Sequence, residues 1–147
     1  MRIALMGQAA FGASSLEALL KEGEDVVAVY APPDRSGGKA DPLATLAGEK
    51  ELPVLQPHSY KDAGVISSLQ EFSPDMLVMV FVTAILPKAL VEIPALGPIC
   101  YHPSLLPPHR GASAIHWAIM MGDEETGLSI FWADGGIDTG PVLLQKK

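Results

Sequence analysis

The chain is poor in cysteine and in basic residues, and each shortage argues against a class of protein. Its one cysteine, Cys100, excludes an internal disulfide framework and is compatible with a reducing compartment, so we expect a cytoplasmic location. Lysine and arginine number 10 against 17 acidic residues, which gives a net charge of −7 at pH 7. This balance argues against a general electrostatic grip on nucleic acid or on an anionic membrane.

Long apolar runs are also missing. No stretch approaches the ~20 apolar residues that a membrane span needs, and the longest run, Met76–Phe81, has the length of a strand. The first run, Ile3–Met6, stops at Gly7, far short of the apolar core of a signal peptide. The chain does contain 48% hydrophobic residues in 147 positions, which is enough for one folded domain with a sizeable core. We therefore expect a soluble protein with no membrane partner.

Short apolar runs alternate with helical segments along the chain. Strands are predicted at Ile3–Met6, Val26–Tyr30, Pro53–Leu55, Met76–Phe81, Ile99–Tyr101, Leu128–Ala133 and Val142–Gln145. Helices are predicted from a capping box at Ser14–Glu17 to Gly23, and at Leu43–Lys50, Lys61–Gln70, Pro87–Val91 and Ser113–Met121. Prolines and glycines make residues 31–42 a loop. The alternation predicts an α/β fold, Rossmann-like, with a mostly parallel sheet and helices on both faces.

Two polar residues follow predicted strands and are the main candidates for chemistry. His102 opens a proline-rich loop, and Asp138 lies in a glycine-rich loop that also contains Asp134. In parallel α/β sheets ligands bind beyond the carboxyl ends of the strands, although the strand before Asp138 can also pair antiparallel to its neighbour. A histidine titrates near neutral pH, and a carboxylate beside it can hold its charge and tautomer. The pattern predicts general acid–base chemistry, and spacing alone does not choose between the two aspartates.

Other polar residues are open to structural interpretations. Cys100 is expected on the same side of its strand as His102. It can be interpreted as a nucleophile or as a small buried residue, and we favour the second interpretation. His109, Arg110 and His116 are interpreted as polarity of a loop or helix face. The four histidines lack zinc-site spacing, so no metal is expected. Residues 7–12 (GQAAFG) lack the middle glycine of a dinucleotide fingerprint and the lysine of a P-loop, which favours a tight strand–helix turn.

The whole chain resembles the formyltransferase family, whose members use 10-formyltetrahydrofolate as formyl donor. The segments that carry the resemblance are MRIALMGQAAFG, PPDRSGGKADPLA, FVTAILP, CYHPSLLPPHRGASAIHW and FWADGGIDTGPVLLQK. Within the family, the chain is most similar to the hydrolase domains of 10-formyltetrahydrofolate dehydrogenases. The resemblance implies the formyltransferase fold and one folate-binding, catalytic domain over residues 1–147. Relatives continue further, so we expect either a C-terminally short fragment or a minimal chain.

The resemblance also implies roles for individual residues. His102 matches the catalytic histidine of the family, Asp138 rather than Asp134 matches its aspartate, and Cys100 stands where many members have a catalytic asparagine. Oxyanion stabilisation would then depend more on His102 and on backbone N–H groups. The folate-binding residues implied are Phe81, Val82, Ile85, Leu86, Leu105, Pro107, Asp134, Gly135 and Gly136.

The implied reaction is attack on the formyl carbon of the folate, without a metal. The attacking group is water in a hydrolase, or an amine acceptor such as methionyl-tRNA in a transferase. Two alternatives stay open: a folate-binding module without turnover, and a dinucleotide-binding domain based on residues 7–12. An uncovered Val142–Gln145 edge strand would in addition predict poor solubility or pairing with a second chain.

Overall fold

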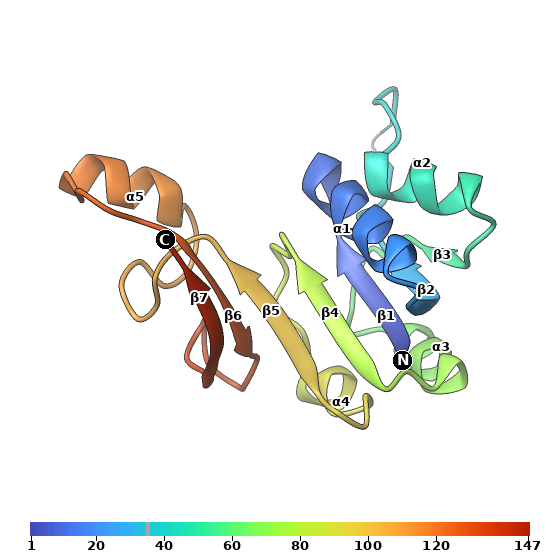
Figure 1. Ribbon diagram of the computed structural model, residues 1–147. Coiled ribbons are helices and arrows are strands. Elements are labelled where there is room, and N and C mark those ends of the chain that lie inside the picture. The colour runs from blue at the N-terminus through green and yellow to red at the C-terminus, as the bar shows by residue number, and fades with distance from the viewer. Residues whose placement is uncertain (35) are drawn as a thin grey trace. The chain divides into compact units, whose positions relative to one another are not determined.

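The computed structural model describes residues 1–34 and 36–147 and contains two compact units, Met1–Pro98 (unit 1) and Ile99–Lys147 (unit 2) (Figure 1). In chain order the elements are β1 (Arg2–Gly7), α1 (Ala9–Lys21), β2 (Asp25–Tyr30), α2 (Pro42–Glu49), β3 (Val54–Leu55), α3 (Ala63–Phe72), β4 (Met76–Val80), α4 (Lys88–Val91), β5 (Pro98–His102), α5 (Ala114–Met121), β6 (Leu128–Trp132) and β7 (Val142–Lys146).

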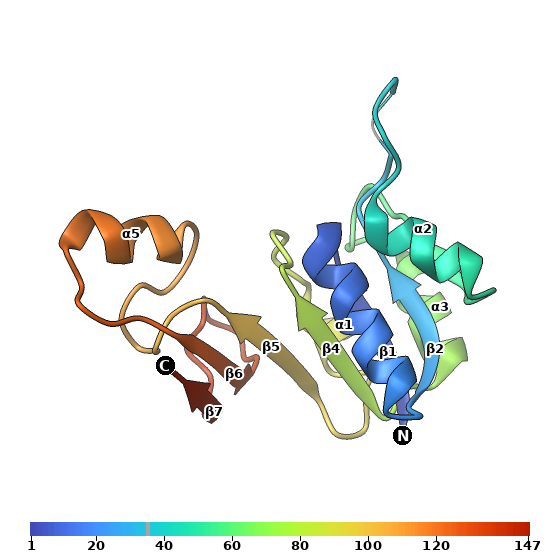
Figure 2. The same ribbon diagram turned by 45° about the horizontal axis from the view of Figure 1, so that its top comes forward.

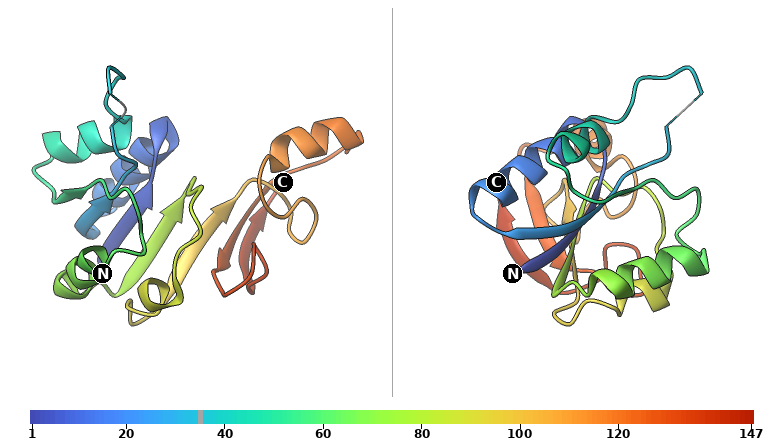
Figure 3. Two further views of the ribbon diagram at one scale, coloured as in Figure 1. Left: turned by 180° about the vertical axis from the view of Figure 1, so that it is seen from behind. Right: turned by 90° about the vertical axis from the view of Figure 1, so that its right-hand side faces the viewer.

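Unit 1 is a parallel sheet covered by helices on both faces. Its strands lie in the order β3-β2-β1-β4, and each neighbouring pair is parallel. Helices α1 and α2 pack on one face, and α3 and α4 lie on the other (Figures 2 and 3). The strands are buried because the helices cover both faces, which explains why they appear as continuous apolar runs in the sequence. This arrangement confirms the predicted α/β class.

Helix α1 begins earlier than the sequence predicted. The capping-box prediction at Ser14 was wrong, because the helix starts at Ala9 and the Ser15 hydroxyl donates to the Phe11 carbonyl at 2.8 Å inside it. The cap comes from a distant residue instead. Both carboxylate oxygens of Asp41 accept from the Ala9 N–H, at 2.9 and 3.1 Å, and one of them also accepts from Leu43 N–H at 2.9 Å. One carboxylate therefore satisfies donors at the starts of α1 and α2.

The two glycines of the GQAAFG segment are explained by packing. A Cβ on Gly7 would lie 2.6 Å from Val80 Cγ2 on β4 and 2.7 Å from the Val80 carbonyl oxygen. Gly12 lies inside α1, where a Cβ would meet Leu43 Cδ2 on α2 at 3.0 Å. The predicted loop through residues 8–12 is therefore mostly helix, and its glycines allow close approach of neighbouring elements.

The other predicted elements are present, with bounds that differ by at most two residues. Strand β4 ends one residue early because Phe81 adopts a left-handed φ of 55°. The described part of the predicted 31–42 loop holds no helix or strand before Pro42, and residue 35 lies outside the described residues.

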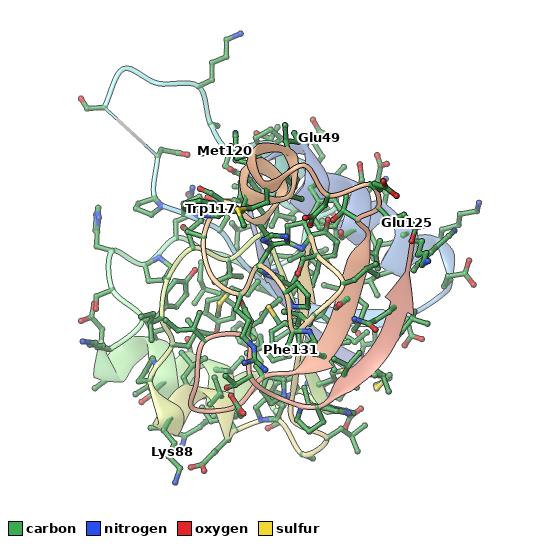
Figure 4. All side chains as sticks on the ribbon, turned by 90° about the vertical axis from the view of Figure 1, so that its left-hand side faces the viewer. Glu49, Lys88, Trp117, Met120, Glu125 and Phe131 are labelled. Atoms are coloured by element: carbon green, nitrogen blue, oxygen red, sulfur yellow. The ribbon has the colours of Figure 1, made fainter. Side chains whose placement is uncertain are left out.

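Unit 2 is built differently, because its strand pairs are antiparallel. Strand β6 pairs with both β5 and β7, and the register places His102 opposite Ser129. The antiparallel alternative that the sequence left open for β6 is therefore realised. Phe131 of β6 is buried, whereas Trp117 and Met120 of α5 are exposed (Figure 4). Every residue of β7 is exposed as well.

The exposure of β7 leads to a prediction about self-association. We expect the purified chain to associate through this strand, since an exposed apolar edge invites pairing with another chain. Leu144 is 58% exposed, and Leu144→Lys is expected to raise the dissociation constant about tenfold or more. Light scattering over a concentration series measures both proteins. A wild-type chain that stays monomeric throughout the series would contradict this expectation.

Candidate active site

The side chain of His102 is held at both ring nitrogens. It lies at the end of β5, only 7% exposed, with Nδ1 3.3 Å from Asp138 Oδ2. Its Nε2 lies 2.7 Å from the carbonyl oxygen of His109. A carbonyl oxygen can only accept a hydrogen bond, so Nε2 carries a proton in the neutral and in the charged ring. The nitrogen whose protonation can change is therefore Nδ1, the one that faces Asp138.

Asp138 is fixed by both its side chain and its main chain. The residue adopts a left-handed φ of 51°, and its side chain is 18% exposed. Oδ2 accepts from the Gly111 N–H at 2.7 Å, and the Asp138 carbonyl accepts from Arg110 Nε at 2.8 Å. The loop after His102 and the loop of Asp138 are thus joined at two points. The arrangement brings together a histidine and a carboxylate that can exchange one proton.

Asp134 is engaged elsewhere in its own loop. Its Oδ1 accepts from the Thr139 hydroxyl at 2.6 Å and from the Gly136 N–H at 2.9 Å. These two hydrogen bonds, that of Thr139 first, lower the pKa of the Asp134 carboxyl below its ordinary value. The carboxylate stabilises a turn. The structure therefore places Asp138, and not Asp134, against His102.

Cys100 does not have the properties of a reactive thiol. It lies on β5 two residues before His102, and burial, followed by the negative charge of Asp138, raises the pKa of its thiol to about 12. A thiol with this pKa remains protonated at neutral pH, and the protonated form is a poor nucleophile. The structure therefore favours the interpretation of Cys100 as a small, partly buried residue of the strand.

This assignment predicts that the thiol is dispensable. For the formyl-folate reaction that the family resemblance implies, Cys100→Ala is expected to keep the rate within about threefold of wild type, since the protonated thiol supplies neither thiolate nor base. Initial rates of the two proteins under identical conditions measure the effect. A loss of several orders of magnitude, with the folate still bound, would instead identify Cys100 as a nucleophile.

Several residues that hold the site were not predicted. The hydroxyl of Ser104 donates to the Pro108 carbonyl at 2.7 Å, and that of Ser129 donates to the Ser104 carbonyl at 2.7 Å. Gln145 Nε2 donates to the Leu106 carbonyl at 2.9 Å. These bonds fasten the loop after His102 to β6 and β7. A hydroxyl at a buried position in the apolar strand LSIFW was the available signal.

His109, Arg110 and His116, which the sequence led us to interpret as polarity of a loop or helix face, differ in their surroundings. His109 Nε2 lies 2.6 Å from Asp123 Oδ2, and the His109 carbonyl contacts His102. Arg110 binds the main chain of Asp138. His116 is exposed on α5, as expected for a helix face. The contacts of His109 and Arg110 with the site could not be seen in the sequence.

The predicted folate-binding residues occur in both units. In unit 1, Phe81, Val82 and Ile85 line a cavity of about 320 Å³ together with polar residues that include Gln8 and Tyr60. Burial raises the pKa of Tyr60 to about 12, so its phenol remains a neutral hydrogen-bonding group at neutral pH.

The remaining members of the predicted folate set lie outside the lining of that cavity. Leu86 follows the lining segment 81–85 directly along the chain. In unit 2, Pro107 is exposed, and Leu105 packs beside Gly127, just before β6. Asp134, Gly135 and Gly136 form the exposed turn described above.

Residues 1–34 and 36–147 contain neither a metal-binding cluster nor a membrane-spanning helix. No three His, Cys, Asp or Glu side chains in this part of the chain are grouped so that they would hold a metal ion. None of the described helices combines the length and apolarity needed to cross a membrane.

Comparisons with known proteins identify the family. The mouse mitochondrial 10-formyltetrahydrofolate dehydrogenase is 45% identical over 100% of this chain, and the Pelobacter propionicus methionyl-tRNA formyltransferase is 40% identical over 99% of it. The chain spans only 16% and 47% of the lengths of these two relatives. The crystal structure of phosphoribosylglycinamide formyltransferase from Bacillus halodurans shares the fold, with a TM-score of 0.84 and 23% identity over 99% of this chain and 78% of that one. The formyl transferase family matches residues 1–147 throughout, and the chain belongs to it.

Proposed function

We propose that this chain removes the formyl group of 10-formyltetrahydrofolate, with water or an amine as acceptor. The observation that carries the proposal is the buried His102 with Nδ1 3.3 Å from Asp138 Oδ2. Membership of the family supports it, as do relatives whose names specify a 10-formyltetrahydrofolate dehydrogenase and a methionyl-tRNA formyltransferase. The reaction is an acyl transfer in which a histidine and a carboxylate move protons.

Water is the acceptor that we favour. A net charge of −7 disfavours a polyanionic acceptor such as tRNA, because like charges repel during association. In addition, the relative that is 45% identical over the entire chain is named as a dehydrogenase of 10-formyltetrahydrofolate, and that name specifies no amine acceptor.

Two further expectations concern the setting of the protein. The single cysteine is compatible with a reducing, cytoplasmic location, and the exposed strand β7 favours self-association.

The proposed steps assign the protons as follows. Asp138 accepts a proton from water while the water oxygen forms a bond to the formyl carbon and the carbonyl electron pair moves to the formyl oxygen. The charged His102 ring stabilises this oxyanion. Collapse of the intermediate breaks the bond between the formyl carbon and N10, and N10 receives the proton of Nδ1. Transfer of the proton from Asp138 to His102 restores the pair, and the formic acid released together with tetrahydrofolate loses its proton to solvent and becomes formate.

The predicted folate contacts remain part of the proposal. Their aromatic, aliphatic and proline members are suited to the flat apolar faces of a pterin, and the backbone groups of the Asp134–Gly136 turn are suited to its polar edges. In unit 1 these contacts are Phe81, Val82, Ile85 and Leu86, and in unit 2 they are Leu105, Pro107, Asp134, Gly135 and Gly136.

The test is to mix the purified chain with 10-formyltetrahydrofolate and follow tetrahydrofolate by absorbance, with formate measured separately. Release of both products without an added acceptor is the expected result. Release only after addition of an amine would identify a transferase. Folate binding in a calorimeter without release under either condition would support the second candidate, a binding module, which the Cys100 substitution at the asparagine position favours.

A further inference from the structure

His109 and Asp123 lie outside the proposed proton-transfer pair and are connected to His102 through the main chain of His109. His109 Nε2 lies 2.6 Å from Asp123 Oδ2, and the carbonyl oxygen of His109 lies 2.7 Å from His102 Nε2. Asp123 lies just beyond the end of α5, and its own N–H donates to the Ala118 carbonyl at 3.0 Å. A chain of contacts therefore runs from the end of α5 through His109 to the ring of His102.

The backbone of His109 needs a partner to hold it. Its φ of 56° lies in the left-handed region, which is unfavourable for a residue with a Cβ. This conformation orients the carbonyl that meets His102. The neighbouring bonds, from Ser104 to the Pro108 carbonyl and from Gly111 to Asp138, fix the residues on either side. The bond between the His109 side chain and Asp123 acts on His109 itself, in addition to the bond from His102 Nε2 to the His109 carbonyl.

The consequence for His102 concerns which nitrogen is protonated. While the His109 carbonyl is in place, the neutral ring keeps its proton on Nε2 and turns the free Nδ1 toward Asp138. Without that acceptor, the Asp138 carboxylate would draw the single proton to Nδ1, because the carboxylate would then be the remaining acceptor of the ring among the described residues. A neutral His102 in that form presents no free Nδ1 to accept the proton held by Asp138.

We propose that His109 and Asp123 form a positioning pair that fixes the Nε2–H tautomer of His102. The pair orients a backbone carbonyl and takes no part in the chemical step. The inference rests on the proposed function, because it assigns the pair to the same proton transfer. It predicts that the state of His102 depends on two side chains that do not touch its ring.

The test compares four variants by nitrogen NMR of the His102 ring, assigned by its absence in His102→Asn. Wild type is expected to show the Nε2–H tautomer in its neutral ring, whereas His109→Ala and Asp123→Ala shift the proton mainly to Nδ1. His109→Gly is the matched variant, because glycine adopts a left-handed φ without a penalty and keeps the carbonyl. It is expected to retain more Nε2–H tautomer than the alanine variant. Asp123→Asn keeps a side-chain acceptor for His109 and is expected to restore wild-type behaviour.

Activity supplies a second readout. The two alanine variants are expected to lower kcat by about 10–100-fold, with KM changed less than twofold, since a misplaced catalytic group slows chemistry more than it weakens binding. Glu125→Gln is the control, because Glu125 lies two residues after Asp123 and its replacement breaks only the exposed ion pair with Lys147, so neither kcat nor KM should change.

The outcomes separate this inference from the proposed function. A His109→Ala protein that folds, keeps the Nε2–H tautomer and turns over normally would overturn the positioning role and leave the proposed function intact. A tautomer shift in a chain whose wild type shows no turnover would support the positioning role and contradict the function. Equal tautomer shifts in the glycine and alanine variants would also overturn the inference, because the effect would then not act through the backbone.

Discussion

Replacing Asp138 by asparagine is expected to lower kcat for tetrahydrofolate release by about 10²–10⁴-fold, the usual contribution of a positioned general base. Asparagine retains an oxygen that can accept from the Gly111 N–H, which Asp138 Oδ2 does at 2.7 Å, so the loop should keep its shape. The amide cannot take a proton from the attacking water. Initial rates give kcat and KM, while calorimetry with the folate and a thermal melt show whether binding and folding are intact.

Asp134→Asn is the matched comparison, because it makes the same chemical change in the same loop. The Asp134 carboxylate is bound by Thr139 and Gly136 and, among the described residues, forms no hydrogen bond or ion pair with His102. Its replacement is expected to act on loop stability and on KM, and to reduce kcat by less than about tenfold. Equal losses of kcat in the two variants would contradict the assignment of Asp138 as proton acceptor, and so would an Asp138→Asn protein with the wild-type kcat.

Much of the fold was predictable because strands buried on both faces leave continuous apolar runs. The run Met76–Phe81 predicted β4 to within one residue, and the missing residue, Phe81, is one whose left-handed φ has no sequence signature. The start of α1 was not predictable for a different reason. Its first N–H is capped by Asp41, a residue 32 positions away, whereas capping rules read only the residues next to a helix.

The candidate site also has a part that the sequence predicts and a part that it does not. His102 and Asp138 were accessible to prediction because they are titratable side chains that follow strands, and the resemblance resolved the choice of aspartate. The contacts that fix them come largely from main-chain atoms: the His109 carbonyl and the Gly111 N–H. Main-chain atoms are the same at every residue, so their role depends on loop conformation and not on residue type. A sequence therefore indicates the reacting groups of such a site more readily than the groups that orient them.

The second large effect is expected from Gly140→Ala, because an added Cβ would clash with the main chain against which the Asp138 loop packs. Gly140 is buried where the loop returns to the end of β6, and the Trp132 N–H donates to the Pro141 carbonyl at 2.9 Å beside it. A Cβ at Gly140 would lie 1.7 Å from the Trp132 carbonyl oxygen and 2.9 Å from its carbonyl carbon. These are backbone atoms of a paired strand, so they cannot move aside without breaking the pairing.

We expect Gly140→Ala to destabilise the protein by about 3 kcal/mol or more, which would lower Tm by at least about 5 °C. Gly135→Ala is the matched control, because a Cβ at Gly135 meets no atom within 4 Å, and its stability should stay within about 0.5 kcal/mol of wild type. Thermal and urea unfolding measure both variants. Equal stability of the two would show that the loop does not close against Trp132 as described.

The two large effects can be told apart by measuring Tm and kcat together. Asp138→Asn should lower kcat and leave Tm nearly unchanged. Gly140→Ala should lower both Tm and kcat, because the clash displaces the loop that places Asp138 beside His102.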